Sequence, residues 1–322
     1  MRHVMAIVVA LTFGACGMAI GGVRVVDPLR AAIDAPFDPA QSAALFVGVR
    51  DFTHDKTLTE VRYAVDDAVD LAYLLAIESK PALVSPERVV LALSGEAQKP
   101  ESRQRLAALV AAGAQEQHAE LSDILLALER QARVAEGSGL LIFAFATHGI
   151  NDEGAQYLLA ADSLLRRHHE TAIAETTVRN IASESHAGRS LVLIDACRKK
   201  LTSDSRGGEP DPRCAAALVR AMSRVHGQVV FSAAAAGEYA YDDDVRKNGV
   251  FTAAIIDGLR CAMKRKPNGI ITADALATMV NAQVLTWIQK HHDPYARRGT
   301  QFTADGMAKS MPLAICGASR RQ

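Results

Sequence analysis

Short, continuously apolar runs that alternate with longer helical patterns restrict the fold of this chain more than any other feature. The apolar runs have the length of buried strands and occupy residues 43–49, 88–93, 140–146, 190–196 and 228–234. Apolar residues at three- and four-residue spacing predict helices within 64–77, 101–135, 174–185, 214–225, 249–263 and 272–290. Continuously apolar strands must be covered on both faces. The pattern therefore predicts an α/β fold with a mostly parallel sheet between two helical layers.

The composition limits the partners of the chain. Its 322 residues are 49% hydrophobic, which is enough for one large core or two modest ones. Lys plus Arg and Asp plus Glu both number 36, so the formal net charge is zero. A neutral chain has no overall attraction to nucleic acid, and we expect no nucleic-acid partner.

The first 26 residues depart from this average. Residues 4–23 carry no charge and follow the short basic start Met1-Arg2. This pattern is typical of a signal peptide, of a lipoprotein signal with lipid on Cys16, or of a membrane anchor, and a buried core helix is the remaining alternative. We expect an exported or membrane-anchored protein, on the periplasmic or envelope side if it is bacterial, with residues 27–40 as a linker.

Neither the cysteines nor the paired histidines indicate a metal site. The cysteines are too few for a disulfide framework and lack zinc-ligand spacing; they are Cys16, Cys197, Cys214, Cys261 and Cys316. In an exported chain, two of the last three could form a disulfide. The adjacent pairs His168-His169 and His291-His292 are expected to point apart on helices without a third ligand. We therefore predict surface histidines and no bound metal.

Residues 199–213 interrupt the α/β pattern. They are rich in Ser, Asp, Gly and Pro and have no hydrophobic periodicity, which predicts an exposed loop. Because strand candidates flank the loop, we interpret it as an insertion within one domain over 41–316. The loop then divides a larger half, 41–198, from a smaller half, 214–316.

Two predicted strands end in reactive side chains. The run 140–146 leads into His148-Gly149, and the run 190–196 leads into Cys197. The carboxyl ends of parallel strands meet at one edge of a sheet, so we expect both side chains there. Taken singly, each residue also fits a simpler interpretation, a core cysteine and a turn histidine.

Together, the two residues can perform nucleophilic catalysis. His148 would take the proton of the Cys197 thiol, and the thiolate would attack a carbonyl carbon. The backbone N–H groups of Gly149 and Cys197 would then form an oxyanion hole.

At this point the chain resembles caspase-like cysteine peptidases, with metacaspases and paracaspases as the nearer relatives. Cys197 of "DACRK" lies 49 positions after His148 of "THG", and the resemblance extends through "ALFVGV", "VDDAVDLAYLL", "AQYLLAAD" and "NGVFTAAIIDGL". It implies a caspase-haemoglobinase-like three-layer sandwich over residues 41–316. It also implies an endopeptidase that acts on proteins or peptides without a cofactor. The chain departs from the caspase pattern in "ATHG", which lacks a serine, and at Lys199, where caspases have glycine.

Asp195 is the candidate determinant of specificity. Two residues before Cys197 on an extended strand, its side chain points to the same side, about 7 Å away. The resemblance adds Asp67 and Asp242 to the same substrate pocket, which predicts cleavage after Arg or Lys. Alternatively, Asp195 caps the following turn or pairs with Arg198, and Asp67 is a helix N-terminal carboxylate.

Several further hypotheses remain open. Caspases are often cut between their halves, so we expect self-cleavage at Arg206 or Arg213. A calcium site at residues 241–245 is disfavoured, because the segment lacks alternating oxygen ligands. The rival functions are a catalytically idle homologue that acts as a scaffold or peptide-binding module, and a small-molecule amidase.

Overall fold

The computed structural model describes most of the chain between residues 37 and 315. The described ranges are 37–197, 199–200, 227–234, 239–260, 269–297, 299–304 and 307–315. Several predictions concern segments outside them: the N-terminal signal over 1–26, the helix within 214–225, cleavage at Arg206 or Arg213, and disulfides among Cys214, Cys261 and Cys316.

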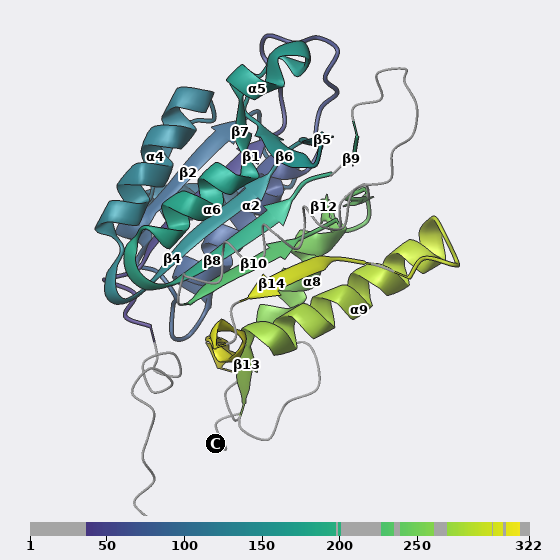
Figure 1. Cartoon of the computed structure of the whole chain (residues 1–322). Coiled ribbons are helices and arrows are strands. Elements are labelled where there is room, and N and C mark those ends of the chain that lie inside the picture. Colours follow the sequence, from purple (N-terminus) through teal and green to yellow (C-terminus); the bar gives the residue numbers. More distant parts are fainter. Residues whose placement is uncertain are drawn as a thin grey trace, which may run out of the picture.

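A seven-stranded sheet forms the centre of the described structure, in the order β14-β10-β8-β4-β1-β2-β3 (Figure 1). Its strands are β1 (Ala43–Val49), β2 (Val89–Ser94), β3 (Gln115–His118), β4 (Glu136–Ala146), β8 (His186–Asp195), β10 (Gln228–Ser232) and β14 (Gln301–Ala304). All neighbouring strands run parallel except β14, which is antiparallel to β10. The five predicted strands are confirmed, and the mostly parallel sheet with them.

The prediction of one continuous helical stretch over 101–135 is wrong. This stretch contains helix α3 (Pro100–Ala111), strand β3 and helix α4 (Leu121–Val134). The side chains of β3, "QEQH", are polar and mostly exposed, so the strand has no apolar alternation to reveal it. Its pairing with β2 at the sheet edge makes it a strand.

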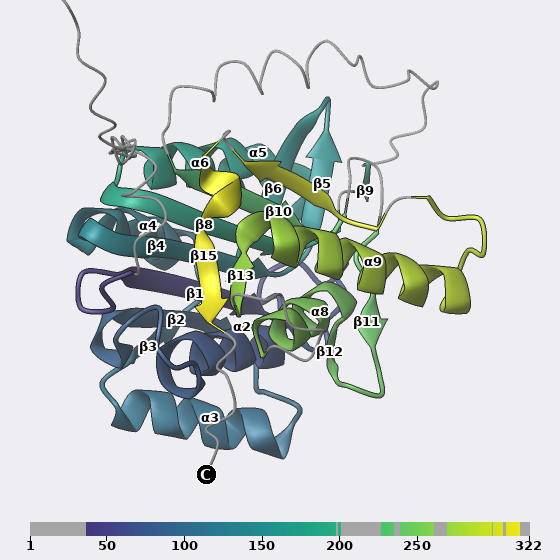
Figure 2. The ribbon, with the colours of Figure 1, turned by 90° about the horizontal axis from the view of Figure 1, so that it is seen from below.

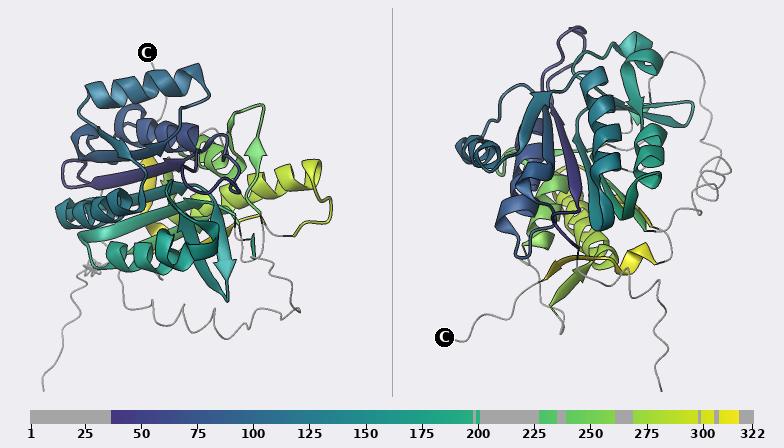
Figure 3. Two further views of the ribbon diagram at one scale, coloured as in Figure 1. Left: turned by 90° about the horizontal axis from the view of Figure 1, so that it is seen from above. Right: turned by 90° about the vertical axis from the view of Figure 1, so that its left-hand side faces the viewer.

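Helices cover both faces of the sheet (Figure 3). Side chains alternate along β1, so that Phe46 packs on one face and Leu45 on the other. The Phe46 face carries α2 (Ala64–Tyr73), continued by a π-helical turn (Leu74–Glu78), α8 (Val250–Leu259) and α9 (Ala273–His291). The Leu45 face carries α4 and α6 (Glu175–Ser183). The predicted three-layer α/β sandwich is therefore confirmed.

Among the described residues, three small sheets accompany the central one. The first has the order β7-β6-β5-β9, formed by β5 (Gly149–Asp152), β6 (Ala155–Leu159), β7 (Ala172–Ala174) and β9 (Lys199–Lys200), and the four-residue helix α5 (His168–Thr171) precedes β7. The others pair β11 (Asp242–Asp243) with β12 (Asn248–Gly249), and β13 (Ile270–Thr272) with β15 (Pro312–Ile315) (Figure 2). Within the part of the chain that the structure describes, no helix has the length and apolar character needed to cross a membrane.

Candidate active site

The two predicted reactive residues follow adjacent strands of the sheet. Strands β4 and β8 are parallel neighbours, and Ala146 at the end of β4 pairs with Asp195 at the end of β8. The chain leaves both strands at the same edge, as expected for parallel strands. His148 and Cys197 consequently line one cavity of about 570 Å³.

The environment of His148 favours a neutral imidazole that can accept a proton. Its Nε2 lies 2.8 Å from the carbonyl oxygen of Thr59, and its ring stacks on Phe52 with 5.2 Å between centroids. A carbonyl can only accept a hydrogen bond, so Nε2 carries the proton and Nδ1 keeps a lone pair. Burial lowers the pKa of His148, against the opposing effect of the Thr59 hydrogen bond.

The Cys197 thiol is half-buried at the cavity wall. It donates to the carbonyl oxygen of Ala240, 3.6 Å away, in the segment that leads into β11. The wall around the thiol is therefore made jointly by the end of β8 and by a segment more than forty residues later.

Gly149 lies directly against the backbone of Cys197. A Cβ atom at Gly149 would approach the Cys197 carbonyl oxygen to 2.0 Å, so only glycine fits. Gly149 lies opposite Leu158 in the antiparallel pairing of β5 with β6. The neighbouring residues His148 and Leu159 are joined by a hydrogen bond from Leu159 N–H to His148 C=O. In antiparallel strands, hydrogen-bonded pairs of residues alternate with pairs that are not hydrogen-bonded. Gly149 is therefore in a non-hydrogen-bonded pair, and its N–H points away from β6.

Asp195 is buried and is held by helix α8. Its Oδ2 accepts hydrogen bonds from the backbone N–H and the hydroxyl of Thr252, at 3.2 and 2.7 Å. Burial raises the pKa of Asp195 to about 6, although both Thr252 hydrogen bonds oppose this effect. Thr252 lies in the first turn of α8, so the partner of Asp195 is a helix start and not the turn that follows Asp195. The alternative partner, Arg198, lies outside the described residues.

Asp67 enters the same region from helix α2. It accepts hydrogen bonds from Asn248 Nδ2, at 2.8 Å, and from the Gly249 N–H, at 3.0 Å to each carboxylate oxygen. Burial and the nearby carboxylate of Asp195 raise the pKa of Asp67 well above its usual value. This pair is therefore the most strongly perturbed group of acids at the cavity.

The other two buried acids of α2 are compensated inside the protein. Asp66 accepts from the backbone N–H groups of Gln98 and Lys99, both at 2.8 Å. Asp70 bonds the Lys99 ammonium and the Arg105 guanidinium, which hold its pKa below the usual value although burial acts in the opposite direction. By contrast, no basic side chain among the described residues forms an ion pair with Asp67 or Asp195.

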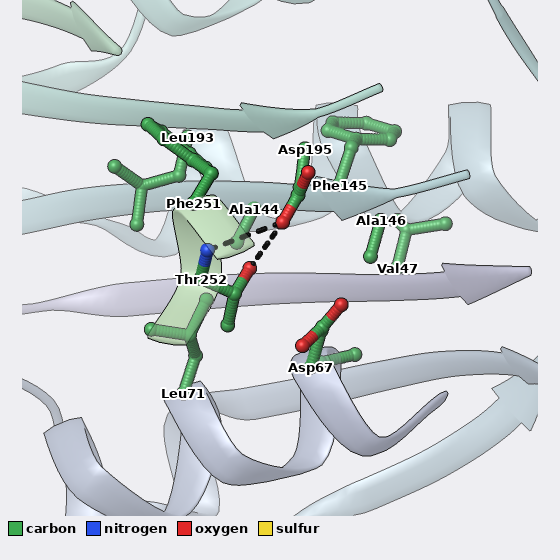
Figure 4. A pocket seen from close by; sticks show the side chains of 11 residues that line it. Val47, Asp67, Leu71, Ala144, Phe145, Ala146, Leu193, Asp195, Phe251 and Thr252 are labelled. Atoms are coloured by element: carbon green, nitrogen blue, oxygen red, sulfur yellow. Dashed lines mark hydrogen bonds between the residues drawn. The ribbon is translucent and has the colours of Figure 1, made fainter. Parts of the chain in front are cut away.

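The carboxylates of Asp195 and Asp67 project toward each other from opposite sides of a small gap (Figure 4). A Cβ atom at Gly249 would lie 2.3 Å from Asp195 Oδ2 and 3.1 Å from Asp67 Oδ2. The lack of a side chain at Gly249 thus lets the backbone of β12 lie close to both acids. They also line a cavity of about 10 Å³, close to the space that one water molecule needs.

Asp242 lines the large cavity from strand β11. Burial raises its pKa, against the opposing charge of Arg62, whose Nε lies 3.6 Å away. Arg62 also pairs with Asp244 at 2.8 Å. The structure therefore brings the three predicted acids, Asp67, Asp195 and Asp242, to the same cavity as His148 and Cys197.

Sequence reasoning missed an aromatic wall of this cavity. Tyr241 and His292 lie 4.4 Å apart between ring centroids, and Trp287 and His291 lie 4.5 Å apart. The two histidines are exposed, as predicted, but they line the cavity. Trp287, His291 and His292 lie more than forty positions after Tyr241 in the sequence, and no local pattern connects them.

Of the predicted surface histidines His168 and His169, only His169 is exposed, and the expectation that the two side chains point apart is wrong. His168 is buried, with 5% of its surface exposed, and the two rings lie side by side with 4.0 Å between centroids. Both rings contact Asp152, which supplies the third ligand-type group that the sequence analysis did not find. The helix α5 begins at His168 and has only four residues, so the regular divergence of neighbouring helical side chains does not apply.

Comparisons with known proteins give consistent results. The model of the caspase domain family matches residues 41–313. Caspase-1 from Spodoptera frugiperda is 12% identical, with a TM-score of 0.53 over 89% of this chain and 94% of that one. A protein from Geobacter sulfurreducens is 10% identical, with a TM-score of 0.52 over 86% of this chain and 99% of that one. Among curated proteins, no sequence matches significantly.

Proposed function

Because the chain belongs to the caspase domain family, we propose that it is a cysteine endopeptidase that cleaves peptide bonds after Arg or Lys. The observation that carries this proposal is the grouping of three acids with a cysteine and a histidine around one cavity. Family membership supports a peptidase that acts on proteins. The acids support the choice of a basic residue before the cleaved bond.

Cys197 and His148 divide the chemistry between them. The Cys197 sulfur attacks the carbonyl carbon of the substrate, and its proton moves to the unprotonated Nδ1 of His148. The protonated imidazole then gives this proton to the departing amine, which leaves an acyl group on the sulfur. Water hydrolyses the thioester, releases the new carboxyl end and restores the thiol.

Backbone groups stabilise the negative oxygen that forms during the attack. The N–H groups of Gly149 and Cys197 are our candidates, and the Gly149 N–H points away from its β6 neighbour. Removing one such donor from an enzyme of this kind costs about a hundredfold or more in kcat.

The acidic pocket provides the counter-charge for a substrate guanidinium or ammonium. Burial raises the pKa of both Asp67 and Asp195, and the nearby carboxylate of Asp195 raises that of Asp67 further, so an entering cation would favour the ionised form of both. Charge-assisted hydrogen bonds at such a site contribute roughly 2–5 kcal/mol, whereas an aspartate side chain would meet repulsion.

Two substitutions test the catalytic assignment. We expect Cys197→Ala and His148→Ala each to abolish cleavage of a peptide library, read by mass spectrometry, without changing the circular dichroism spectrum. A thiol-directed probe should label Cys197 in the parent chain and label it much more slowly in His148→Ala. Cleavage by purified Cys197→Ala would refute the mechanism, and intact peptides with wild-type protein would favour an idle, peptide-binding homologue.

A further inference from the structure

Three side chains that can ligate metals converge where strand β5 ends and helix α5 begins. They are Asp152, His168 and His169, and their ligand atoms all lie within 4.8 Å of one another. The Nε2 atoms of His168 and His169 lie 3.0 and 2.9 Å from the same oxygen, Oδ2 of Asp152. Helix α5 lies next to β6 and β7, at the far end of the small sheet from β9 (Figure 1).

The hydrogen bond on the other side of the His168 ring fixes its tautomer. Nδ1 of His168 lies 3.0 Å from the carbonyl oxygen of Leu165. The carbonyl can only accept, so Nδ1 carries a proton, and the neutral ring has its lone pair on Nε2. This lone pair then faces a carboxylate oxygen of Asp152 at 3.0 Å. Two acceptors at this distance require a cation between or beside them, either a proton or a metal ion.

His169 has a matching arrangement. Its Nδ1 lies 2.9 Å from the hydroxyl oxygen of Tyr157, which leaves Nε2 directed to the side of Asp152. Tyr157 also contacts both imidazole rings edge-on, with centroids 5.0 and 5.1 Å away. Histidines that bind metals typically donate their second nitrogen to an oxygen in this way, which orients the ring.

The ligand types and the spacing fit zinc. Zinc bonds imidazole nitrogen and carboxylate oxygen at about 2.0–2.2 Å, so neighbouring ligand atoms of a tetrahedron lie about 3.3 Å apart. The observed 2.9 and 3.0 Å would need to widen by only a few tenths of an ångström. The His169 side chain is 60% exposed, so water can occupy the fourth position. Two imidazoles disfavour calcium and magnesium, which prefer oxygen ligands.

We propose that Asp152, His168 and His169 bind a zinc ion that fastens the β5–β6 hairpin to α5. Asp152 lies in the same four-residue strand as Gly149, which directly follows His148. The ion would thus stabilise the hairpin next to the catalytic histidine. None of its three ligands lines the large cavity, so this site is independent of the proposed peptidase activity.

Zinc titration of the full chain as the Cys197→Ala variant tests the site, because this background removes the thiol that could bind zinc at the dyad. Isothermal calorimetry with Zn²⁺ should show saturable binding, and Zn²⁺ should raise the melting temperature. His169→Ala and Asp152→Asn, each in this background, should weaken binding at least about tenfold, and Tyr157→Phe should weaken it less. The matched control is His186→Ala, an exposed histidine at the start of β8, which should bind as its parent does.

The same measurements can overturn the proposal. Unchanged Zn²⁺ affinity in both His169→Ala and Asp152→Asn, with their folds verified by circular dichroism, would place the zinc elsewhere. If the Cys197→Ala protein without further substitutions binds no Zn²⁺, only a proton lies between the His168 nitrogen and the Asp152 oxygen. Peptidase activity plays no part in either result, so failure of the zinc site and failure of the proposed function are distinguishable.

Discussion

Replacing Asp195 by asparagine should make the protein more stable and, at the same time, poorer at cutting after arginine. The substitution keeps the shape of the side chain. Both hydrogen bonds from Thr252 end on one carboxylate oxygen, Oδ2, and the amide oxygen of asparagine can accept both of them. The change therefore removes a buried negative charge and little else.

The stability gain follows from the raised pKa. The carboxyl of Asp195 ionises at about 6 in the folded protein and at 3.8 in its usual environment. Between these values the folded state holds a proton that the unfolded state has lost, so stability falls as the pH rises through this window. Each unit of difference between the two pKa values corresponds to about 1.4 kcal/mol, so above pH 6 the ionised Asp195 lowers the free energy of unfolding by about 3 kcal/mol. Asp195→Asn does not ionise and should escape this loss.

The functional loss follows from the same charge. Truncating one partner of a buried charge pair costs about 2–5 kcal/mol, which corresponds to roughly 30-fold to several-thousand-fold in kcat/KM for peptides with Arg before the cleaved bond. The loss for peptides with an uncharged residue there should be much smaller, because they do not use the carboxylate.

Urea unfolding of the Cys197→Ala chain, with and without Asp195→Asn, measures the change in the free energy of unfolding. The Cys197→Ala background is used because it should not cleave itself. We expect Asp195→Asn to raise the free energy of unfolding by about 3 kcal/mol at pH 7.5. At pH 5 the gain should be about half as large, because this pH lies about halfway between the unfolded-state and folded-state pKa values of Asp195. The matched control is Asp70→Asn. Asp70 is also buried, but it is paired with Lys99 and Arg105, so removing its charge should destabilise the protein.

Two results would refute this reasoning. One is a destabilised Asp195→Asn chain at pH 7.5, which would mean that an internal cation compensates the carboxylate. The other is a gain of stability that does not shrink between pH 7.5 and pH 5, because such a gain could not arise from ionisation.

Three further predictions concern activity. In a pH profile, kcat/KM for arginine peptides should fall about tenfold per pH unit below about 6, because Asp195 must be ionised to bind a guanidinium; a flat profile from pH 7 to pH 5 would contradict this. Gly149→Ala should lower kcat at least about a hundredfold in peptide assays, because its Cβ would displace the Cys197 carbonyl, and a fully active variant would exclude the close approach. Intact-mass measurement should find wild-type protein cut at Arg206 or Arg213 and Cys197→Ala uncut, whereas a single uncut chain with full activity would exclude a role in maturation.

The strands and the reactive residues could be predicted from the sequence because their signals are local. A buried parallel strand is a short apolar run, and β1 was predicted at both of its ends, Ala43 and Val49. The placement of His148 and Cys197 then followed from the rule that parallel strands end at one edge of the sheet.

The partners of the acidic residues could not be predicted, because they come from distant parts of the chain. Asp67 meets Asn248 across 181 positions, and Asp195 meets Thr252 across 57. No periodicity connects such residues, so only the resemblance to a family pointed to Asp67 and Asp242. The polar edge strand β3 was missed because its tetrapeptide has no apolar alternation and is held by backbone pairing with β2.

Comparison of matched peptide substrates tests the central proposal most directly. Three fluorogenic peptides, identical except for Arg, Lys or Asp before the cleaved bond, are offered to the wild-type chain and to Cys197→Ala. We predict cleavage of the Arg and Lys peptides with kcat/KM at least about a hundredfold above that of the Asp peptide, and no cleavage by Cys197→Ala. Preferred cleavage after Asp, or equal cleavage by the two proteins, would contradict it.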